Sequence, residues 1–254
     1  MKIAVCVKQI PDQATPYALD PSTHFVVRPN DQVLDDTDRY GIEVGLQLAA
    51  AAGEDATVTV FSMGPSGTMQ GIRQALSMGA DGAVVVDDPS LRGAEALLTA
   101  RVLAAAIARS GFDVVVAGTE STDGYSGVVP QQIAELLGVP ALTFARKVEK
   151  TADGIRIERQ TAAGYDVVEA ATPVLLSVTA GSVEPRYPSF KGIMAAKSRP
   201  VETLSVADLG VEVSSAQTIT GVEPVAARQA GEIIEDDGEA HLRILALLEQ
   251  RKVV

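Results

Sequence analysis

The pattern of hydrophobic and polar positions alternates between two periods over the first two-thirds of the chain. Short runs rich in β-branched residues, typical of buried strands, are separated by longer stretches of Ala and Leu at helical spacing. A glycine lies at or just beyond the end of each helical stretch, where a left-handed residue often ends a helix. The predicted strands are 3–7, 57–61, 82–86 and 114–117, and the predicted helices are 42–52, 68–78, 95–108 and 129–137. This alternation predicts an α/β fold with a mostly parallel sheet sandwiched by helices.

The pattern changes after Leu142. Three further runs are typical of strands, and the first two are separated by a turn rich in Ala and Gly, which indicates a hairpin at the sheet edge. Beyond Gly181 the regular pattern is lost, so we expect a loop rich in Pro, Gly and Lys, an irregular C-terminal arm and a short final helix. The three strands are 155–159, 165–169 and 174–178, the loop is 184–200, the arm is 201–254 and the final helix is 241–250.

Composition and charge exclude several classes of function. The 254 residues, 46% of them hydrophobic, are enough for a packed core. The formal charge of −12 disfavours nucleic acid as a partner, because an acidic chain repels phosphate backbones. The single cysteine, Cys6, excludes a disulfide within the chain and suits a reducing compartment.

The hydrophobic runs and the polar residues point to a cytoplasmic protein without catalytic machinery. No apolar run reaches the roughly 18 residues of a membrane helix, and the N-terminal run is too short for a signal peptide. We therefore expect a cytoplasmic chain that is not inserted in a membrane. No Ser–His–Asp set, pair of catalytic carboxylates or His cluster stands out, so we expect no acid–base enzyme.

Three segments lie where a parallel sheet binds ligands, beyond the carboxyl ends of its strands. They are 7–12, 62–65 and 117–129. The third collects hydroxyl groups and glycines between a strand and a helix, so its helix start is a candidate anion site, with Asp123 as a ribose acceptor or helix cap. An ordinary solvated turn explains the same residues equally well, because Ser, Thr, Asp and Gly are common in turns. Neither a Walker loop nor a GxGxxG motif is present.

Two smaller features lie before or within the first predicted elements. The acidic run Asp35 to Asp38 precedes the first long helix, and a negatively charged N-cap is the preferred interpretation over a wall of a nucleotide pocket. No regular ligand spacing supports a metal there. Cys6 lies in a predicted buried strand, which favours a structural thiol over a nucleophile.

Three longer motifs carry a resemblance to a known family. They are VCVKQIPD at 5–12, ALSMGAD at 75–81 and EPRYPSFKGIMAAK at 184–197. With these motifs the chain resembles the beta subunits of electron transfer flavoproteins over nearly its whole length. The sequence Ser-Phe-Lys-Gly at 189–192 is similar to the actinobacterial branch of that family.

The resemblance implies a fold related to adenine-nucleotide hydrolases and a role as an electron carrier rather than an enzyme. It implies a heterodimer with an alpha subunit that holds most of the FAD, while this chain buries a structural AMP. Electrons would pass from acyl-CoA dehydrogenases, as in fatty acid β-oxidation, to a membrane-bound quinone oxidoreductase. The main domain would then be a nucleotide-binding domain over 1–200 that includes a partner-recognition loop at 184–200, and the arm 201–254 would pack on the alpha subunit.

The same resemblance implies site residues by position. The docking loop presents Phe190 as an apolar anchor, where many members have Leu. Two departures from the family pattern are Val128 and Pro130, which replace a Gln and a Gly, and a thinned basic cluster of Lys191, Lys197 and Arg199. The implied AMP site comprises Cys6 (through its backbone), Asp35, Asp36, Thr37, Asp38, Met63, Gly118, Thr119, Glu120, Ser121, Thr122, Asp123, Gly124, Tyr125, Ser126, Gly127, Val128 and Val129. The implied docking residues are Phe190, Lys191, Ile193, Met194 and Lys197.

Three alternatives stay open at this point. A bifurcating branch of the family holds a second FAD in place of AMP, and its nucleotide loop usually keeps the Gln that Val128 replaces here. A stand-alone adenine-nucleotide-binding module would not need the docking loop or the arm. An enzyme of the nucleotide-hydrolase group needs a phosphate loop after the first strand, which the segment 8–11 does not supply.

Overall fold

The chain forms two compact units, which are described separately. The computed structural model describes residues 1–64, 67, 69–223, 225 and 231–254. The first unit is Met1–Ile219 and the second is Thr220–Val254. Pro65, at the end of the segment 62–65, and Thr68, the expected start of a helix, lie outside the described residues.

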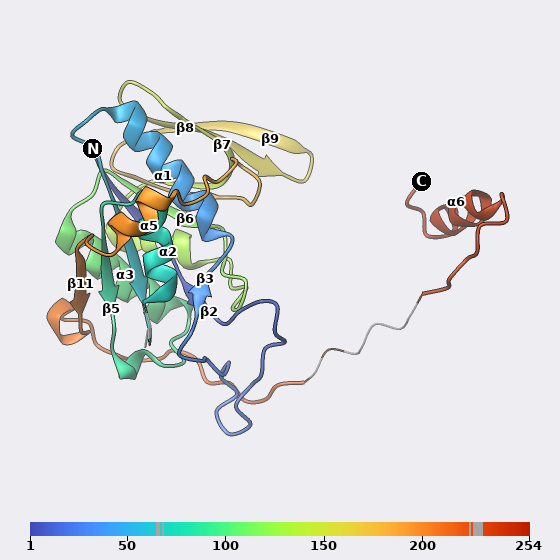
Figure 1. The fold of residues 1–254 in the computed structure, drawn as a ribbon, viewed down its shortest axis with the longest axis horizontal. Helices are drawn as coiled ribbons and strands as arrows, with labels where there is room; N and C mark the ends of the chain where they lie inside the picture. The colour runs from blue at the N-terminus through green and yellow to red at the C-terminus, as the bar shows by residue number, and fades with distance from the viewer. Residues whose placement is uncertain (65–66, 68, 224, 226–230) are drawn as a thin grey trace. The chain divides into compact units, whose positions relative to one another are not determined.

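A single large sheet organises the first unit (Figure 1). Its strands are β1 (Lys2–Cys6), β4 (Thr57–Met63), β5 (Gly82–Val86), β6 (Val114–Gly118), β7 (Ala141–Lys150), β8 (Gly154–Thr161), β9 (Gly164–Ala171), β10 (Val174–Val178) and β11 (Val201–Leu204). In the described part of the chain these nine strands are ordered β11-β5-β4-β1-β6-β10-β7-β8-β9. Pairing is parallel from β11 to β7 and antiparallel from β7 to β9. Apart from this sheet, β2 (Gln9–Ile10) pairs antiparallel with β3 (Val33–Leu34).

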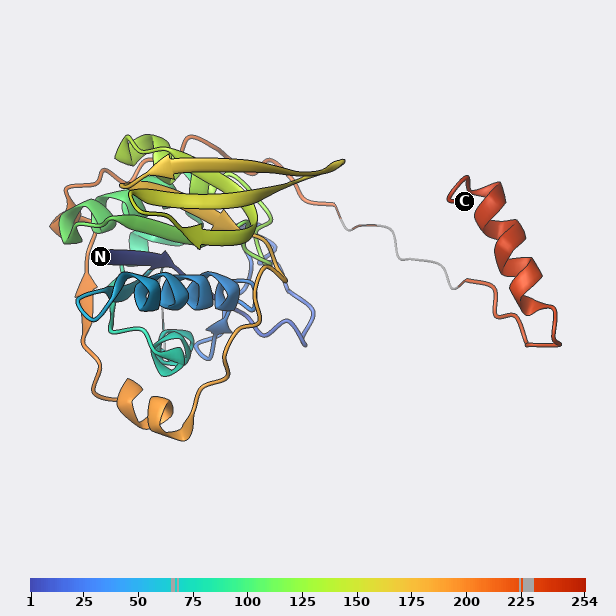
Figure 2. The same cartoon turned by 90° about the horizontal axis from the view of Figure 1, so that it is seen from above.

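Helices cover both faces of this sheet (Figure 2). One face carries α1 (Asp38–Ala52) and α2 (Gln70–Met78), with α5 (Phe190–Ala196) packed on α2. The other carries α3 (Ala96–Ser110) and α4 (Val129–Leu137). Because side chains alternate along a strand, Ile3 and Val5 of β1 enter the α1/α2 core, while Ala4 and Cys6 enter the α3/α4 core. This burial on both faces explains the continuous apolar runs in the sequence.

The structure confirms the predicted fold class, the long helices and the hairpin β8–β9 at one edge of the sheet. Five elements differ from expectation, and two of them are the unpredicted short strands β2 and β3. The alternating strand β7 and the four-residue strand β11 were not predicted, and the segment 184–200 contains the helix α5 rather than loop alone. The strand β10 lies inside the sheet, between β6 and β7, although it follows the edge hairpin in the chain.

The first unit extends beyond residue 200, where the sequence suggested that the main domain ends. The reason is β11, which pairs in parallel with β5 and buries Leu204. The second unit contains α6 (Ala240–Gln250), none of whose residues is buried. None of the helices in the described residues is long and apolar enough to cross a membrane.

Candidate functional site

Three of the expected site residues mark the ends of neighbouring strands. Met63 ends β4, Cys6 ends β1 and Gly118 ends β6. These strands are adjacent and parallel, so their carboxyl ends meet at one edge of the sheet. The structure therefore brings together residues that are more than 100 positions apart in the sequence.

Asp35 is a fully buried carboxylate that ties two of the expected segments together. Its Oδ1 accepts hydrogen bonds from the backbone nitrogen and the hydroxyl of Thr37, at 3.0 and 2.8 Å. Its Oδ2 accepts from the backbone nitrogen and the hydroxyl of Thr122, at 2.8 and 3.0 Å. The start of α1 is thereby fixed to the loop after β6. Thr37 occupies the N-cap position of α1 without capping it by its own side chain, and the Asp35 carboxylate two residues earlier accepts the backbone nitrogen of Thr37.

The buried carboxyl of Asp38 lies beside the end of β1. Its Oδ2 accepts a hydrogen bond of 2.6 Å from the backbone nitrogen of Lys8. Burial, and then the charge of Asp35, raise the pKa of Asp38 well above its usual value. Burial, and then the charge of Asp38, raise the pKa of the Cys6 thiol to about 12. Cys6 is therefore a neutral thiol at physiological pH, as expected of a structural cysteine.

Asp123 is the buried centre of an ion-pair cluster. Lys8 Nζ lies 2.6 Å from its Oδ1, and Arg28 Nη2 contacts its Oδ2. Burial alone would raise the pKa of Asp123, but the charges of Lys8 and Arg28 lower it below its usual value. The expectation that this residue caps α4 is wrong, because both carboxylate oxygens are used within the cluster and α4 has no side-chain cap among the described residues.

The loop before α4 leads into a helix start that no described side chain caps. Gly127 takes a left-handed conformation with φ of 63°, and a Cβ there would lie 3.3 Å from Glu120 Oε2. No side chain in the described residues caps the helix that starts at Val129; Pro130 has no N–H and the N–H of Gln132 bonds the carbonyl of Val128, which leaves the N–H groups of Val129 and Gln131 without a side-chain acceptor. Free N–H groups at a helix start attract anions. Val128, in the place of the family's Gln, offers no polar side chain.

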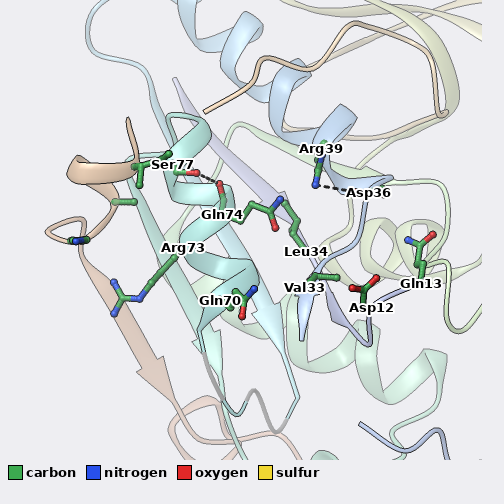
Figure 3. A pocket seen from close by; sticks show the side chains of 13 residues that line it. Asp12, Gln13, Val33, Leu34, Asp36, Arg39, Gln70, Arg73, Gln74 and Ser77 are labelled. Carbon is green, nitrogen blue, oxygen red and sulfur yellow. Dashed lines mark hydrogen bonds and ion pairs between the residues drawn. The ribbon is translucent and has the colours of Figure 1, made fainter. Parts of the chain in front are cut away.

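A cavity of about 590 Å³ is lined by side chains of α1, α2 and α5 and of the segment before α1 (Figure 3). It is bounded by the start of α1, by α2 and by α5, and not by the loop 118–129. Asp36, which is exposed and forms an ion pair of 3.1 Å with Arg39, lines it together with the docking residues Ile193 and Lys197. The remaining lining residues are Asp12, Gln13, Val33, Leu34, Gln70, Arg73, Gln74, Ser77 and Ala196.

The expected docking residues lie on α5 and are open to solvent. Phe190, the first residue of α5, is 81% exposed, and Ile193 and Met194 are about half exposed. Lys191 and Lys197 are also exposed. Phe190 is therefore not part of the local core, where isolated aromatic residues are usually found.

Sequence reasoning missed three residues that hold the loop at the sheet edge. Lys8 and Arg28 bind Asp123, and Gln13 Nε2 donates a 3.1 Å hydrogen bond to Thr122 Oγ1. Lys8 lies directly beyond β1, close to an acidic loop, and this position could have predicted its ion pair with Asp123. Arg28 belongs to an irregular stretch without periodicity, and no sequence pattern there predicted its ion pair with Asp123. Among the described residues, no group of three or more His, Cys, Asp or Glu side chains could hold a metal ion.

Comparison with known proteins identifies the family. The family model described as "Electron transfer flavoprotein domain" matches residues 23–209. A Mycobacterium tuberculosis protein named electron transfer flavoprotein subunit beta is 40% identical over 263 residues, which cover 99% of each chain. A Thermoanaerobacterium thermosaccharolyticum protein of the same name is 34% identical over 264 residues, 100% of each chain. An Anaerotignum propionicum protein named acryloyl-CoA reductase electron transfer subunit gamma is 31% identical over 208 residues, 80% of this chain and 77% of the relative.

The fold and these matches define a subunit of a flavin-dependent electron carrier rather than an enzyme. The chain belongs to the electron transfer flavoprotein family, and its full-length relatives are beta subunits. The resemblance seen in the three sequence motifs is thereby confirmed. A beta subunit implies an alpha partner, and the family implies association with a flavin.

The hydrogen bonds of Asp35 generate a test of the site's internal structure. In Asp35→Ala the donors on Thr37 and Thr122 lose their acceptor inside the protein, so the free energy of unfolding should fall by about 3 kcal/mol. Asp36→Ala is the matched control, because Asp36 is exposed and its loss should change stability by less than about 0.5 kcal/mol. Urea denaturation of the two variants measures the difference. Equal effects would show that Asp35 does not hold the loop.

Proposed function

We propose that this chain is the beta subunit of a heterodimeric electron transfer flavoprotein that carries electrons from acyl-CoA-type dehydrogenases, as in fatty acid β-oxidation, to a membrane quinone oxidoreductase. FAD, held mainly by the alpha subunit with this chain along one side, supplies the redox chemistry. The present chain supplies binding surfaces. The relative from Anaerotignum propionicum is named as an electron transfer subunit of acryloyl-CoA reductase, which supports an acyl-CoA-type partner.

The exposed apolar face of α5 is the observation that carries this proposal. Phe190, Ile193 and Met194 are three and four positions apart and so share one side of the helix. Tyr187, just before the helix, is 85% exposed. Exposed apolar groups that gather in one place are typical of protein interfaces, and large aromatic residues often dominate their binding energy. A stand-alone nucleotide-binding module would have no use for such a surface.

The second part of the proposal is a structural AMP at the carboxyl edge of the sheet. Its phosphate would lie at the uncapped start of α4, near Gly127, where free N–H groups support an anion. Asp35 and Asp38 would shape the walls of this site through the hydrogen bonds that fix the loops. Val128 favours AMP over the second FAD of the bifurcating branch, which usually keeps a Gln at this position.

The third part concerns the second unit and the cellular compartment. On α6, the residues Leu242, Ile244, Leu245 and Leu247 are each about half exposed, which supports a helix that packs on the alpha subunit. The complex would work in the cytoplasm. The single, buried and unpaired Cys6 supports a reducing compartment.

Co-expression with an alpha subunit tests the assembly. We expect a yellow heterodimer, whereas this chain alone should be colourless. Residues from Thr220 onward should be cleaved by protease in the isolated chain and protected in the complex, because they form few contacts of their own. A colourless co-purified pair, or equal cleavage in both states, would contradict the proposal.

Gly127→Asp tests the AMP site. The substitution adds a negative charge and a side chain at a left-handed position beside the helix start, so AMP should be lost from the complex. Gly138→Asn, at the opposite end of α4, is the control, because Asn tolerates the left-handed conformation there. Chromatography of the nucleotides released on denaturation measures the outcome. Two FAD and no AMP in the unmodified complex would assign the chain to the bifurcating branch.

Phe190→Ala tests the docking surface. Loss of an interface anchor typically costs on the order of 2 kcal/mol, so the apparent KM of a partner dehydrogenase for the complex should rise roughly thirtyfold. Phe190→Leu keeps an apolar anchor and should stay close to the unmodified value. Flavin content should be the same in both variants. If Phe190→Ala instead loses flavin while KM holds, the docking assignment is wrong.

A further inference from the structure

The proposed docking segment, residues 184–200, is held on the protein by contacts that lie away from its exposed face. It leaves the sheet after β10, forms α5 and returns to the sheet at β11 (Figure 2). A surface segment with exposed aromatic residues is costly to order when a partner binds, since each immobilised side chain loses conformational entropy. Contacts that order this segment before the partner binds therefore reduce this entropy loss and raise the affinity of docking.

Glu43 on α1 makes the most extensive of these contacts. Its side chain is 5% exposed, and its Oε2 accepts hydrogen bonds from Arg186 N at 3.1 Å and Arg186 Nε at 2.7 Å. Its Oε1 accepts from Arg186 Nη2 at 3.0 Å and from Gln47 Nε2 at 3.0 Å. The guanidinium is thus bound in two-pronged geometry, and the backbone of the docking segment is bound as well.

The charges of this pair favour the ionised form of both groups. Burial alone would raise the pKa of Glu43, but its hydrogen bonds with Arg186 lower it below the usual value. The hydrogen bond with Glu43 raises the pKa of Arg186. The Glu43 carboxylate is buried and both of its oxygens accept hydrogen bonds, so water does not compete for this contact. The contact therefore fixes Arg186, the residue directly before Tyr187.

Helix α5 has a second support on α2. A Cβ built on Gly192 would lie 2.4 Å from the carbonyl oxygen of Ser77, so only glycine fits without a shift of backbone. Ser189 Oγ accepts a 3.0 Å hydrogen bond from Gly192 N at the start of the helix, and Ala196 is buried in the core. The helix is therefore seated on α2, while Arg186 holds the chain that leads into it.

We propose that Glu43 is a positioning residue for docking: by binding Arg186 it fixes the segment so that Tyr187 and Phe190 are presented to the dehydrogenase in one conformation. The inference rests on the proposed docking function of Phe190. Glu43 lies on α1 and is buried, so it acts on the partner through Arg186 alone.

Glu43→Gln in the assembled complex tests this role, because Gln keeps the size of the side chain but removes the charge and replaces one of the two acceptor oxygens with an NH2 group that cannot accept from Arg186 or Gln47. The apparent KM of the dehydrogenase for the complex should rise roughly three- to tenfold, the effect expected when one or two side chains must be ordered on binding. The kcat at saturation and the flavin content should not change. Backbone amides of 184–190 should exchange hydrogen faster. Glu169→Gln is the control, because its ion pair with Arg156 is exposed and lies on the β8–β9 hairpin.

A double substitution separates this inference from the docking proposal. If Glu43 acts through Phe190, Glu43→Gln should add little to KM once Phe190→Ala is present. Full additivity, or an unchanged KM for Glu43→Gln beside a raised KM for Phe190→Ala, overturns the positioning role and leaves docking intact. An unchanged KM for both variants overturns the docking function and the inference with it. A loss of flavin in Glu43→Gln also overturns the inference, because it shows a general structural role.

Discussion

Parallel pairing of β4, β1 and β6 is the constraint on which the candidate site depends. It sends three carboxyl ends to the same edge of the sheet, and it requires helices on both faces because the strands are apolar on both sides. The connections therefore cross the sheet and begin at that edge. Because the strands pair in parallel, the loop that leads to α4 begins at this edge, and its glycines and hydroxyl groups lie there without any single sequence motif.

The same edge is unusually rich in buried acidic groups, and each one is satisfied by defined donors. Asp35 accepts four hydrogen bonds, and Asp123 binds two cationic side chains. A buried carboxylate without such partners would cost several kcal/mol, so the loops have little freedom to rearrange while the carboxylates stay buried. The loop before α4 is consequently shaped by the protein itself. The nucleotide proposed to bind there would meet a preformed helix start rather than induce one.

The sequence predicts the parts of this fold that depend on local pattern. The helices have a clear period, the central strands are continuous apolar runs, and glycines mark the helix ends. The strand β7 escapes prediction because its polar, half-exposed positions dilute the apolar signal, and β11 because it has only four residues. Helix α5 contains a glycine and lies among prolines, so local propensity argues against it, and it forms through its contacts with α2. The cluster around Asp123 depends on Arg28, whose role arises only when distant segments meet.

Helix α1 connects the two regions that are proposed to bind ligand and partner. Asp38, its first residue, binds the backbone of Lys8 at the sheet edge, and Glu43 binds the docking segment. Five residues of helix separate them by about 7.5 Å along its axis and place them on different sides. Buried side chains such as Ile42 fix the helix between them on the sheet. Because the two contacts share a rigid helix but no side chain, the charge of Glu43 can be removed without disturbing the bond between Asp38 and Lys8. The proposed docking segment and the proposed nucleotide site are therefore linked through one helix, and we expect substitutions in one to leave the other unchanged.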